Sequence, residues 1–382
     1  MKVAIISFVN PFRGVKNGAS EVVVEDCLNF CKKGDSVTLF SFFNKSEAKN
    51  NFSFPLPLRL AEYPTVSNPF LFLSLYPYCV ARRCSRHLFE EAWESYDLVL
   101  FEGEQVFKVF EKIHSRCKKS VIRMHDIESD YRKELARSQR GVLKFLNYFE
   151  GLKFKRIEKR ISKRYQVPLF FLSKDEKCVF AKRYGFNENK CLFVPPTFQF
   201  HPVGMASDSS GLLYFGDLSL ANNAKSLAWF LTDVFPAVLV KAPDATITIC
   251  GKNSKNFAGK FQNLSKNMIV KGFVPSLEDE FRSCRAVICP ILYGAGVKIK
   301  LLESLSFGKV VIANKKALEG TTFIDGAHLL VADDSENFAL MCLRCLDSQQ
   351  VLPDFSSALE KEFATVYSFS FFLHQVNSAL SL

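Results

Sequence analysis

The stretch AVICPILYGAGVKIKLLESLSFGKVVIA, residues 286–313, contains two strand-like runs separated by a glycine-rich turn and a helical pattern. The β-branched runs AVIC and VVIA are typical of strands in a parallel sheet that is covered on both faces. Between them, LYGAG is typical of a turn, and VKIKLLESLSF has the apolar spacing of a helix. A strand, a turn, a helix and a second strand predict an α/β protein with a parallel sheet.

The rest of the chain repeats this rhythm of short apolar runs and helical segments. In the first half the predicted strands are KVAIISFV, SVTLFSF, LVLFE (98–102), SVIRM (120–124) and PLFFL (168–172). In the second half they are LLYFG (212–216), TITIC (246–250), MIV (268–270), AVICP, VVIA and HLLVA (328–332). At 382 residues the chain exceeds one ordinary core, and prolines, serines and glycines cluster at 194–211. We therefore expect two doubly wound domains joined near this cluster.

The composition indicates a folded globular protein. Hydrophobic residues make up 48% of the chain and aromatic residues 14%, which argues against disorder. The 12 cysteines form no dense spacing pattern, so we expect reduced thiols. Cys342 and Cys345 form a CxxC in a helical context without a second pair, which favours buried core thiols over a zinc site.

Two apolar segments near the N-terminus are too short to be membrane elements. MKVAIISFV is too short for the core of a secretion signal and suits an opening strand. PFLFLSLYPYCV (69–80) falls short of the roughly 20 residues that a spanning helix needs, and it contains Pro77. We therefore expect a soluble or peripheral protein.

The net charge of +11 is concentrated in residues 132–164, where basic and apolar side chains are interleaved. A basic amphipathic stretch can lie on an anionic membrane, and nucleic acid is the rival partner. An equally acceptable interpretation is a solvated helix with one apolar face in the core. The basic residues are Arg132, Lys133, Arg137, Arg140, Lys144, Lys153, Lys155, Arg156, Lys159, Arg160, Lys163 and Arg164, and the acidic ones are Glu134, Glu150 and Glu158.

Residues that follow the predicted strands are candidate site residues, because open α/β sheets bind ligands outside the carboxyl ends of their strands. His125 follows SVIRM, Gly216 and Gly251 follow two strands of the second half, and the turn 293–296 follows AVICP. A glycine-rich turn that opens a helix suggests an anion, since free N–H groups point outward there. The turn has neither the GxGxxG nor the GxxxxGK[ST] spacing, so its glycines alone are a weak signal.

The second half, residues 211–345, resembles the C-terminal domain of the group 1 glycosyltransferases, family 4 of the sequence classification. The resemblance lies in an ordered series: LLYFGDLSLANNAKSLAWFLTDVFP, PDATITICGKN, IVKGFVPSLEDEFRSCRAVICPILYGAGVKIKLLESLSFGKVVIANKKALEG and HLLVADDSENFA. In the first half, NGASEVVVEDCLNFCKKGDSVTLFS is similar to the family's glycine loop, helix and second strand. RMHDIESDY (123–131) and SKDEKCVFAKRYG resemble its R-x-H-[ND]-x-E segment and its later Ser-[KD] helix.

The resemblance implies the GT-B fold, in which two Rossmann-like domains face each other across a cleft. It implies an acceptor-binding domain at 1–200 and a nucleotide-sugar donor domain at 201–354. The final segment, 355–382, resembles the closing helix that crosses back to the first domain. No cofactor and no metal are expected, because enzymes of this fold use lysines and helix dipoles in place of a divalent cation.

In the donor domain, the resemblance assigns Glu303 to the ribose diol, whose two hydroxyl groups a carboxylate can accept together. The turn 294–296 would present N–H groups to the diphosphate, and Lys298 would add positive charge. Spacing alone favours Glu303 as a surface residue paired with Lys300. The donor-binding residues that the resemblance implies are Glu303, Lys298, Gly294, Ala295, Gly296, Gly216, Gly272, Phe273 and Val274, the last three near the base.

In the first domain, the resemblance implies that His125 is the catalytic residue facing the donor sugar. There it would hydrogen-bond a sugar hydroxyl or stabilise an oxocarbenium-like state. A single histidine is more often structural, but its place in RMHDIE favours the site. Gly18 and Ala19 would form the acceptor or phosphate loop, where small residues let the backbone approach a ligand.

Two positions depart from the family's pattern. The family often has a second glutamate eight residues before Glu303, where this chain has Ala295, so the donor sugar is left open. The Arg/Lys pair that is frequent after the Gly216 strand is absent, since the chain reads GDLSLANNAK with Asp217 in the usual Arg position. We interpret the second departure as variation between branches of the family.

The leading expectation is a retaining glycosyltransferase of the hexosyltransferase type. It would move a sugar from a nucleoside-diphosphate donor to a hydroxyl of a cell-surface glycan or lipid-linked acceptor, in polysaccharide or lipopolysaccharide synthesis. Its expected location is the cytoplasm, with residues 132–164 at the anionic inner face of the plasma membrane. The alternatives are a sugar-nucleotide epimerase of the same fold and a non-catalytic glycan- or nucleotide-binding subunit. Nucleic-acid binding ranks last, because no recognised motif accompanies the basic residues.

Overall fold

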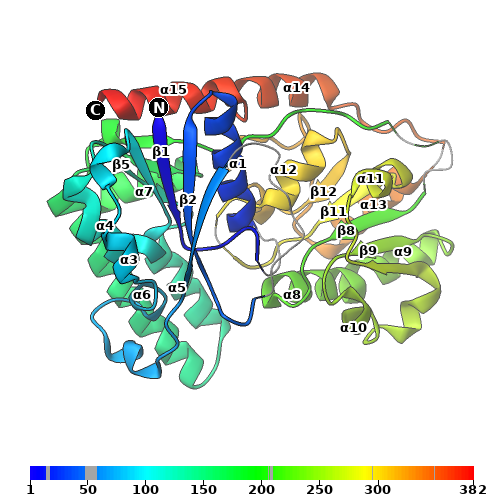
Figure 1. Cartoon of the computed structure of the whole chain (residues 1–382). Helices are drawn as coiled ribbons and strands as arrows, with labels where there is room; N and C mark the ends of the chain where they lie inside the picture. Colours follow the sequence, from blue (N-terminus) through cyan, green and yellow to red (C-terminus); the bar gives the residue numbers. More distant parts are fainter. Residues whose placement is uncertain (14–17, 48–57, 205, 207–209, 295, 348) are drawn as a thin grey trace. The chain divides into compact units, whose positions relative to one another are not determined.

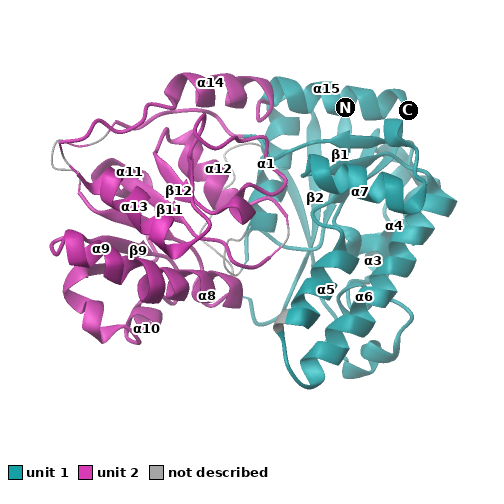
Figure 2. Cartoon of the chain, turned by 180° about the vertical axis from the view of Figure 1, so that it is seen from behind, with its two compact units in different colours: residues 1–197, 369–382 teal, residues 198–368 magenta. Residues whose placement is uncertain are grey.

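The computed structural model describes residues 1–13, 18–47, 58–204, 206, 210–294, 296–347 and 349–382. The chain folds into two compact units (Figure 2). The first unit is Met1–Thr197 with Phe369–Leu382, and the second is Phe198–Ser368. Each unit contains a parallel sheet with helices, so the predicted α/β class is confirmed (Figure 1).

The sheet of the first unit has seven parallel strands in the order β3-β2-β1-β4-β5-β6-β7. The order β3-β2-β1-β4-β5 is that of a Rossmann sheet, and the chain reverses direction across the sheet between β1 and β4. The sequence missed β3, an edge strand with no buried residue, and β7, which has only three residues. The bounds are β1 Lys2–Ser7, β2 Ser36–Phe43, β3 Leu58–Pro64, β4 Leu98–Glu102, β5 Ser120–Met124, β6 Leu169–Phe171 and β7 Cys191–Phe193.

Both faces of this sheet are buried, because successive side chains of a strand point to opposite sides. Ile5 packs on one face with Phe30 and Phe372, and Phe101 packs on the other with Phe154. The C-terminal helix α15 belongs to this unit, so the chain returns to it as the fold class predicts (Figure 1). The longer helices are α1 Gly18–Lys32, α4 Phe107–Ile113, α5 Glu128–Ser138, α6 Val142–Arg160, α7 Lys174–Tyr184 and α15 Phe369–Ser381.

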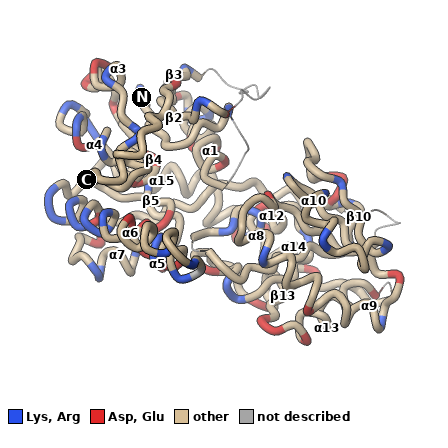
Figure 3. Tube along the Cα trace, turned by 90° about the horizontal axis from the view of Figure 1, so that it is seen from below, with Lys and Arg blue, Asp and Glu red and all other residues tan. Residues whose placement is uncertain are grey.

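Helices α5 and α6 are consecutive and pack against each other. Lys and Arg positions gather along both helices (Figure 3). In the second half of α6, Phe154 and Ile157 are buried in the core of the unit. The first half of α6, residues 142–149, is mostly exposed. The solvated-helix interpretation of this stretch therefore does not hold for residues 142–149, whose apolar side chains are exposed.

The second unit has six parallel strands in the Rossmann order β10-β9-β8-β11-β12-β13, and here the chain reverses between β8 and β11. Cys342 and Cys345 are buried in α13 and form no disulfide, which confirms the core-thiol interpretation. The strands are β8 Leu212–Phe215, β9 Ile247–Cys250, β10 Met268–Gly272, β11 Ala286–Cys289, β12 Val311–Ala313 and β13 Leu330–Val331. The helices are α8 Ala221–Trp229, α9 Phe235–Lys241, α10 Ser254–Ala258, α11 Glu278–Ser283, α12 Ile299–Ser306, α13 Ser335–Leu346 and α14 Ser356–Thr365.

The units have bounds close to those of the two domains that the sequence suggested. The continuous part of the first unit ends at Thr197. The closing segment was expected to return to the first domain from residue 355, but α14 belongs to the second unit and the return begins at Phe369. The roles of acceptor and donor domain stay predictions. Within the described residues, no helix has both the length and the apolar character needed to cross a membrane.

Candidate functional site

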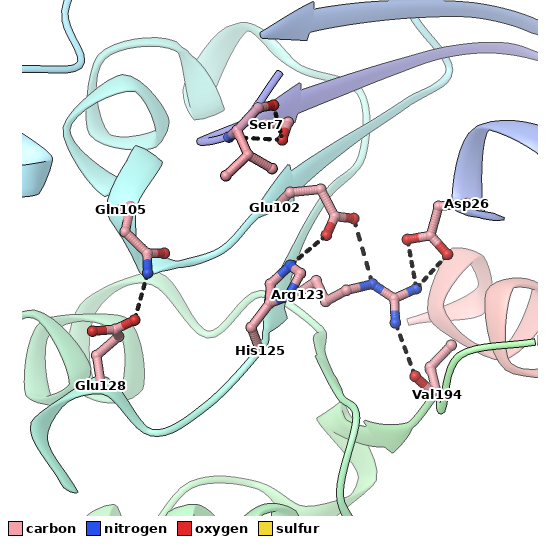
Figure 4. Close-up of polar contacts among 9 residues, drawn as sticks. Ser7, Asp26, Glu102, Gln105, Arg123, His125, Glu128 and Val194 are labelled. Carbon is pink, nitrogen blue, oxygen red and sulfur yellow. Dashed lines mark hydrogen bonds and ion pairs between the residues drawn. The ribbon is translucent and has the colours of Figure 1, made fainter. Parts of the chain in front are cut away.

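Two polar residues lie at the carboxyl ends of neighbouring strands in the first unit. His125 directly follows β5, and Glu102 is the last residue of β4. The Nε2 atom of His125 lies 2.8 Å from Oε2 of Glu102, and both side chains are buried (Figure 4). β4 lies next to β1, at the reversal point where open α/β sheets bind ligands. The structure thus gives the predicted catalytic histidine a carboxylate partner.

Arg123 connects this pair to α1. Its register partner on β4 is Glu102, and its Nε lies 3.4 Å from Oε1 of that residue. One terminal nitrogen lies 2.8 Å from Oδ2 of Asp26 on α1, and the other donates a 2.8 Å hydrogen bond to the carbonyl oxygen of Val194 (Figure 4). Two buried carboxylates therefore share one guanidinium group.

Burial controls the protonation of this cluster. It lowers the pKa of His125 to about 3, with the positive charge of Arg123 as the second cause. It raises the pKa of Asp26 well above its usual range and also raises that of Glu102, although Arg123 opposes both shifts. A neutral imidazole has one N–H donor. When His125 donates from Nε2 to Glu102, its Nδ1 atom carries the lone pair and acts as an acceptor.

Sequence reasoning found His125 but missed Glu102, Arg123 and Asp26 as its supports. A signal was present, because Glu102 ends the otherwise apolar run LVLFE, and a charge at the end of a buried strand needs a partner. Asp26 could not be found this way, since it lies 97 residues from Arg123 in the sequence.

Phe8, which follows β1, forms an aromatic wall beside the histidine. The ring centroids of Phe8 and His125 are 5.3 Å apart, with the rings at 87°. Gly103 follows β4 with φ +82°, and a Cβ atom there would lie 2.8 Å from the Phe8 ring. Glycine at 103 therefore permits Phe8 to pack at this position.

Gly18 and Ala19 lie in the first turn of α1. The loop that was expected to carry them precedes the helix, and its residues 14–17 lie outside the described part of the chain. Small residues at a helix N-terminus leave the polarised N–H groups accessible. Their contact with an acceptor or a phosphate group stays a prediction.

In the second unit, three glycines bring the ends of β8, β9 and β10 together. The Gly216 N–H donates to the Cys250 carbonyl oxygen at 3.1 Å, and the Gly251 N–H donates to the Gly272 carbonyl oxygen at 2.6 Å. Gly251 has φ +125°, and a Cβ atom there would lie 2.1 Å from the carbonyl oxygen of Gly216. The ends of these strands therefore form a close-packed backbone surface that leaves no room for a side chain at Gly251. Gly216, Gly251 and Gly272 are called the glycine row from here on.

The turn after β11 leads into α12. Gly294 and Gly296 have φ +102° and +74°, a conformation that favours glycine, and Ala295 between them lies outside the described residues. Lys298 is the N-cap residue of α12, and its ammonium group contacts the carbonyl oxygens of Gly294, at 3.3 Å, and Gly296. The turn thus places a lysine charge at the positively polarised end of a helix.

Lys300, in the first turn of α12, is held by two residues of the same unit. The ammonium group of Lys300 lies 3.1 Å from Oδ1 of Asn223 and 4.9 Å from the ring centroid of Tyr214. Lys225 lies over the ring of Tyr293 at 5.3 Å. The sequence did not predict these partners. Asn223 and Lys225 both lie in the segment ANNAK, where the family's usual Arg/Lys pair is absent.

The remaining predicted donor residues surround the same strand ends. Glu303 is half-buried in the middle of α12. Gly272 ends β10 with φ +79°, and Val274 packs against the core. Phe273 is 73% exposed, which excludes the alternative that it is an ordinary core residue. The contacts of these residues with a donor stay predictions.

A search of the described residues finds no group of three or more His, Cys, Asp or Glu side chains that could hold a metal ion. The buried acids Asp26 and Glu102 are bound to Arg123 instead.

The match to a known protein family lies in the second unit. Residues 209–348 match the family model described as glycosyl transferases group 1. This match contains the glycine row, the turn 294–296 and α12. A Klebsiella pneumoniae protein described as an uncharacterized 44.6 kDa protein in the cps region is 31% identical over 261 residues. The aligned part spans 64% of this chain and 64% of that relative.

Solved structures with the same fold cover the whole chain. HepE of Anabaena, in complex with UDP and glucose, has a TM-score of 0.68 and 14% identity, covering 100% of this chain and 99% of its own. TarM of S. aureus, in complex with UDP and alpha-GlcNAc-glycerol among other ligands, has a TM-score of 0.72 and 9% identity over 100% of both chains. WaaG, a glycosyltransferase involved in lipopolysaccharide biosynthesis, has a TM-score of 0.65 and 15% identity over 99% and 98%. These structures show the GT-B fold for the whole chain. The match of residues 209–348 to the family model supports a group 1 glycosyltransferase.

Proposed function

We propose that this chain transfers a sugar from a nucleoside-diphosphate donor to a hydroxyl of a cell-surface glycan or lipid-linked acceptor, with retention at the anomeric carbon. The observation that carries the proposal is the contact of the Lys298 ammonium group with the carbonyl oxygens of Gly294 and Gly296 at the start of α12, in the same unit as the glycine row. The UDP complexes of HepE and TarM support a nucleotide-sugar donor. The cps region of the Klebsiella relative and the role of WaaG support polysaccharide synthesis.

The turn and α12 would stabilise the leaving group. As the bond between the sugar C1 and the diphosphate oxygen breaks, negative charge grows on the departing diphosphate. Backbone N–H groups at Gly294 and Gly296 and the start of α12 would bind this charge. Lys298, now bonded to carbonyl oxygens of the turn, would supply a full positive charge. Glu303, one helical turn further along α12, would accept the ribose hydroxyls.

His125 would act on the donor sugar as a neutral hydrogen-bond acceptor. Its low pKa means that it carries no proton to give to the leaving group at neutral pH. A sugar hydroxyl can donate to its Nδ1 atom while Nε2–H is held by Glu102. Glu102 is then a positioning residue, and Arg123 with Asp26 holds Glu102 in place.

The reaction is proposed to need no divalent metal, because two lysines and a helix start can balance the diphosphate charge. Chelation of divalent ions should leave the rate unchanged. A rate that falls on chelation and returns with Mg²⁺ or Mn²⁺ would contradict this part of the proposal. The cytoplasm, with a peripheral position at the inner face of the plasma membrane, is the proposed location.

The test begins with binding. The unfolding temperature of the protein is measured with a panel of nucleoside diphosphates and sugar nucleotides. A nucleoside diphosphate and a sugar nucleotide with the same base that both raise this temperature identify the donor. Release of the nucleoside diphosphate is then measured with that donor, with and without membrane extract as the acceptor source. Acceptor-dependent release supports transfer. Interconversion of sugar nucleotides without acceptor would show an epimerase, and binding without turnover would show a non-catalytic subunit.

A further inference from the structure

Two segments far apart in the sequence expose apolar side chains on the first unit. One is the 3-10 helix η1 (Pro69–Leu73) with Leu75, and the other is the part of α6 (Val142–Arg160) that spans residues 142–152. A cluster of exposed apolar side chains can mark an interaction site. The exposed residues, here called the apolar face, are Phe70, Phe72, Leu73 and Leu75 from the first segment and Val142, Leu143, Phe145, Leu146, Tyr148, Phe149 and Leu152 from the second.

Contacts hold residues 69–78 beside the middle of α6. The ammonium group of Lys153 on α6 donates to the carbonyl oxygen of Phe72 at 2.8 Å. Glu150, also on α6, accepts a 2.5 Å hydrogen bond from the Tyr78 N–H. The Tyr78 ring in turn stacks on Phe72, with centroids 4.1 Å apart. The position of residues 69–75 is therefore fixed by α6, a pairing that no sequence pattern predicted.

The surroundings of the apolar face are strongly basic. Two of the three acids that the sequence counts in 132–164 are buried: Glu150 is bound as above, and Glu158 accepts from the N–H and hydroxyl of Ser129. Among the described side chains of this stretch, Glu134 is the one exposed acid. The exposed basic residues are Lys133, Arg137, Arg140, Lys144, Lys155, Arg156, Lys159, Lys163 and Arg164.

We infer that the apolar face docks on an anionic lipid bilayer, with residues 69–75 inserting beside the basic helices α5 and α6. A bilayer surface offers hydrocarbon to Phe70, Leu73 and Leu75 and headgroup phosphates to the lysines and arginines. Nucleic acid would match the charge but leave the aliphatic side chains in water. The inference deepens the membrane partner of the proposed function, and it adds a segment, 69–75, outside the basic stretch. Its test does not depend on catalysis.

The experiment is co-sedimentation of the full chain with phosphatidylcholine vesicles that do or do not contain phosphatidylglycerol, at low and high salt. The wild type should bind the anionic vesicles and be released by salt. The pairs Phe70→Ser/Leu73→Ser and Phe145→Ser/Phe149→Ser should each weaken binding by about tenfold or more, because each removes inserted apolar area. The matched control is Val240→Ser/Val351→Ser, at positions 81% and 94% exposed in the second unit, which should bind like the wild type.

Several outcomes would overturn the inference. If the Phe70→Ser/Leu73→Ser variant binds anionic vesicles as strongly as the wild type, residues 69–75 are not part of the membrane-binding surface. Equal binding to neutral and anionic vesicles would remove the role of the basic helices. No vesicle binding, together with concentration-dependent dimers that the same variants abolish in sedimentation velocity, would make the face a protein interface. Nucleotide binding measured on the same variants keeps this result separate from a failure of the proposed donor site.

Discussion

The Nε2 atom of His125 lies 2.8 Å from Oε2 of Glu102, and the other carboxylate oxygen of Glu102 lies 3.4 Å from Arg123. The relationship follows from the sheet, since β4 and β5 pair in a register that sets Glu102 opposite Arg123. His125 directly follows β5, and its Nε2 atom reaches the same carboxylate group. The carboxylate can therefore hold the imidazole in one orientation while the guanidinium group holds the carboxylate.

We predict that His125→Ala lowers kcat by about 100-fold and leaves donor affinity nearly unchanged, because the contact to the sugar matters most in the transition state. Glu102→Gln keeps the shape of the side chain and removes its charge, and kcat should fall by about tenfold, since the ring is less well held. Turnover and the donor Kd are measured separately. Wild-type turnover in His125→Ala would return this histidine to a structural role.

For Glu303→Ala we predict donor binding weaker by about tenfold or more, or roughly 1.5 to 3 kcal/mol for a lost charge-assisted contact. Titration calorimetry with the nucleoside diphosphate measures it. Glu336→Ala removes an exposed carboxylate from α13 of the same unit and serves as the control. Equal affinities for the two variants would remove Glu303 from the donor site.

Replacement of Gly251 by alanine should destabilise the second unit severely, by about 3 kcal/mol or more, because the added Cβ atom would collide with backbone. It would lie 2.1 Å from the carbonyl oxygen of Gly216 at φ +125°. Gly326 also has a positive φ, +72°, but no atom lies within 4 Å of its Cβ position. Gly326→Ala should therefore cost only about 1 kcal/mol of backbone strain. Urea unfolding compares the two, and similar losses would contradict the close packing of the glycine row.

Glu128 provides a test of pH dependence. Burial raises its pKa to about 7, with Asp126 contributing and Arg132 opposing. The folded state then binds more protons than the unfolded state between the ordinary pKa of 4.5 and 7, so wild-type stability falls as pH rises through this window. Glu128→Gln, which can still accept from the Gln105 amide, avoids this loss. The stability of the variant relative to the wild type should rise by up to about 3 kcal/mol between pH 4.5 and pH 8.

The matched control for this change is Glu134→Gln, an exposed carboxylate on the same helix α5. Its free energy of unfolding, measured with urea at several pH values, should follow that of the wild type. If Glu128→Gln shows the same pH dependence as this control, Glu128 is ionised in the folded state at neutral pH.

Most of the fold could be predicted from the sequence, because a buried parallel strand is recognisable from a short run of apolar residues. Runs such as LVLFE and AVIC need no partner to be recognised, and their alternation with helical patterns implies parallel pairing. The edge strand β3 lacked such a run and was missed. The same limit applies to the site. His125 and the turn 294–296 follow strands directly, whereas Asp26 and Asn223 act through partners far away in the chain.

By itself, the sequence determined the α/β class, the two parallel sheets and the strand ends where a site would form, since these depend on apolar periodicity and on glycines. Only the tertiary structure decided the protonation of His125, because its pKa depends on burial and on Arg123. Only the tertiary structure joined residues 69–75 to α6, through the bond between Lys153 and Phe72. Burial and long-range contacts are properties of the packed chain, and no local pattern encodes them.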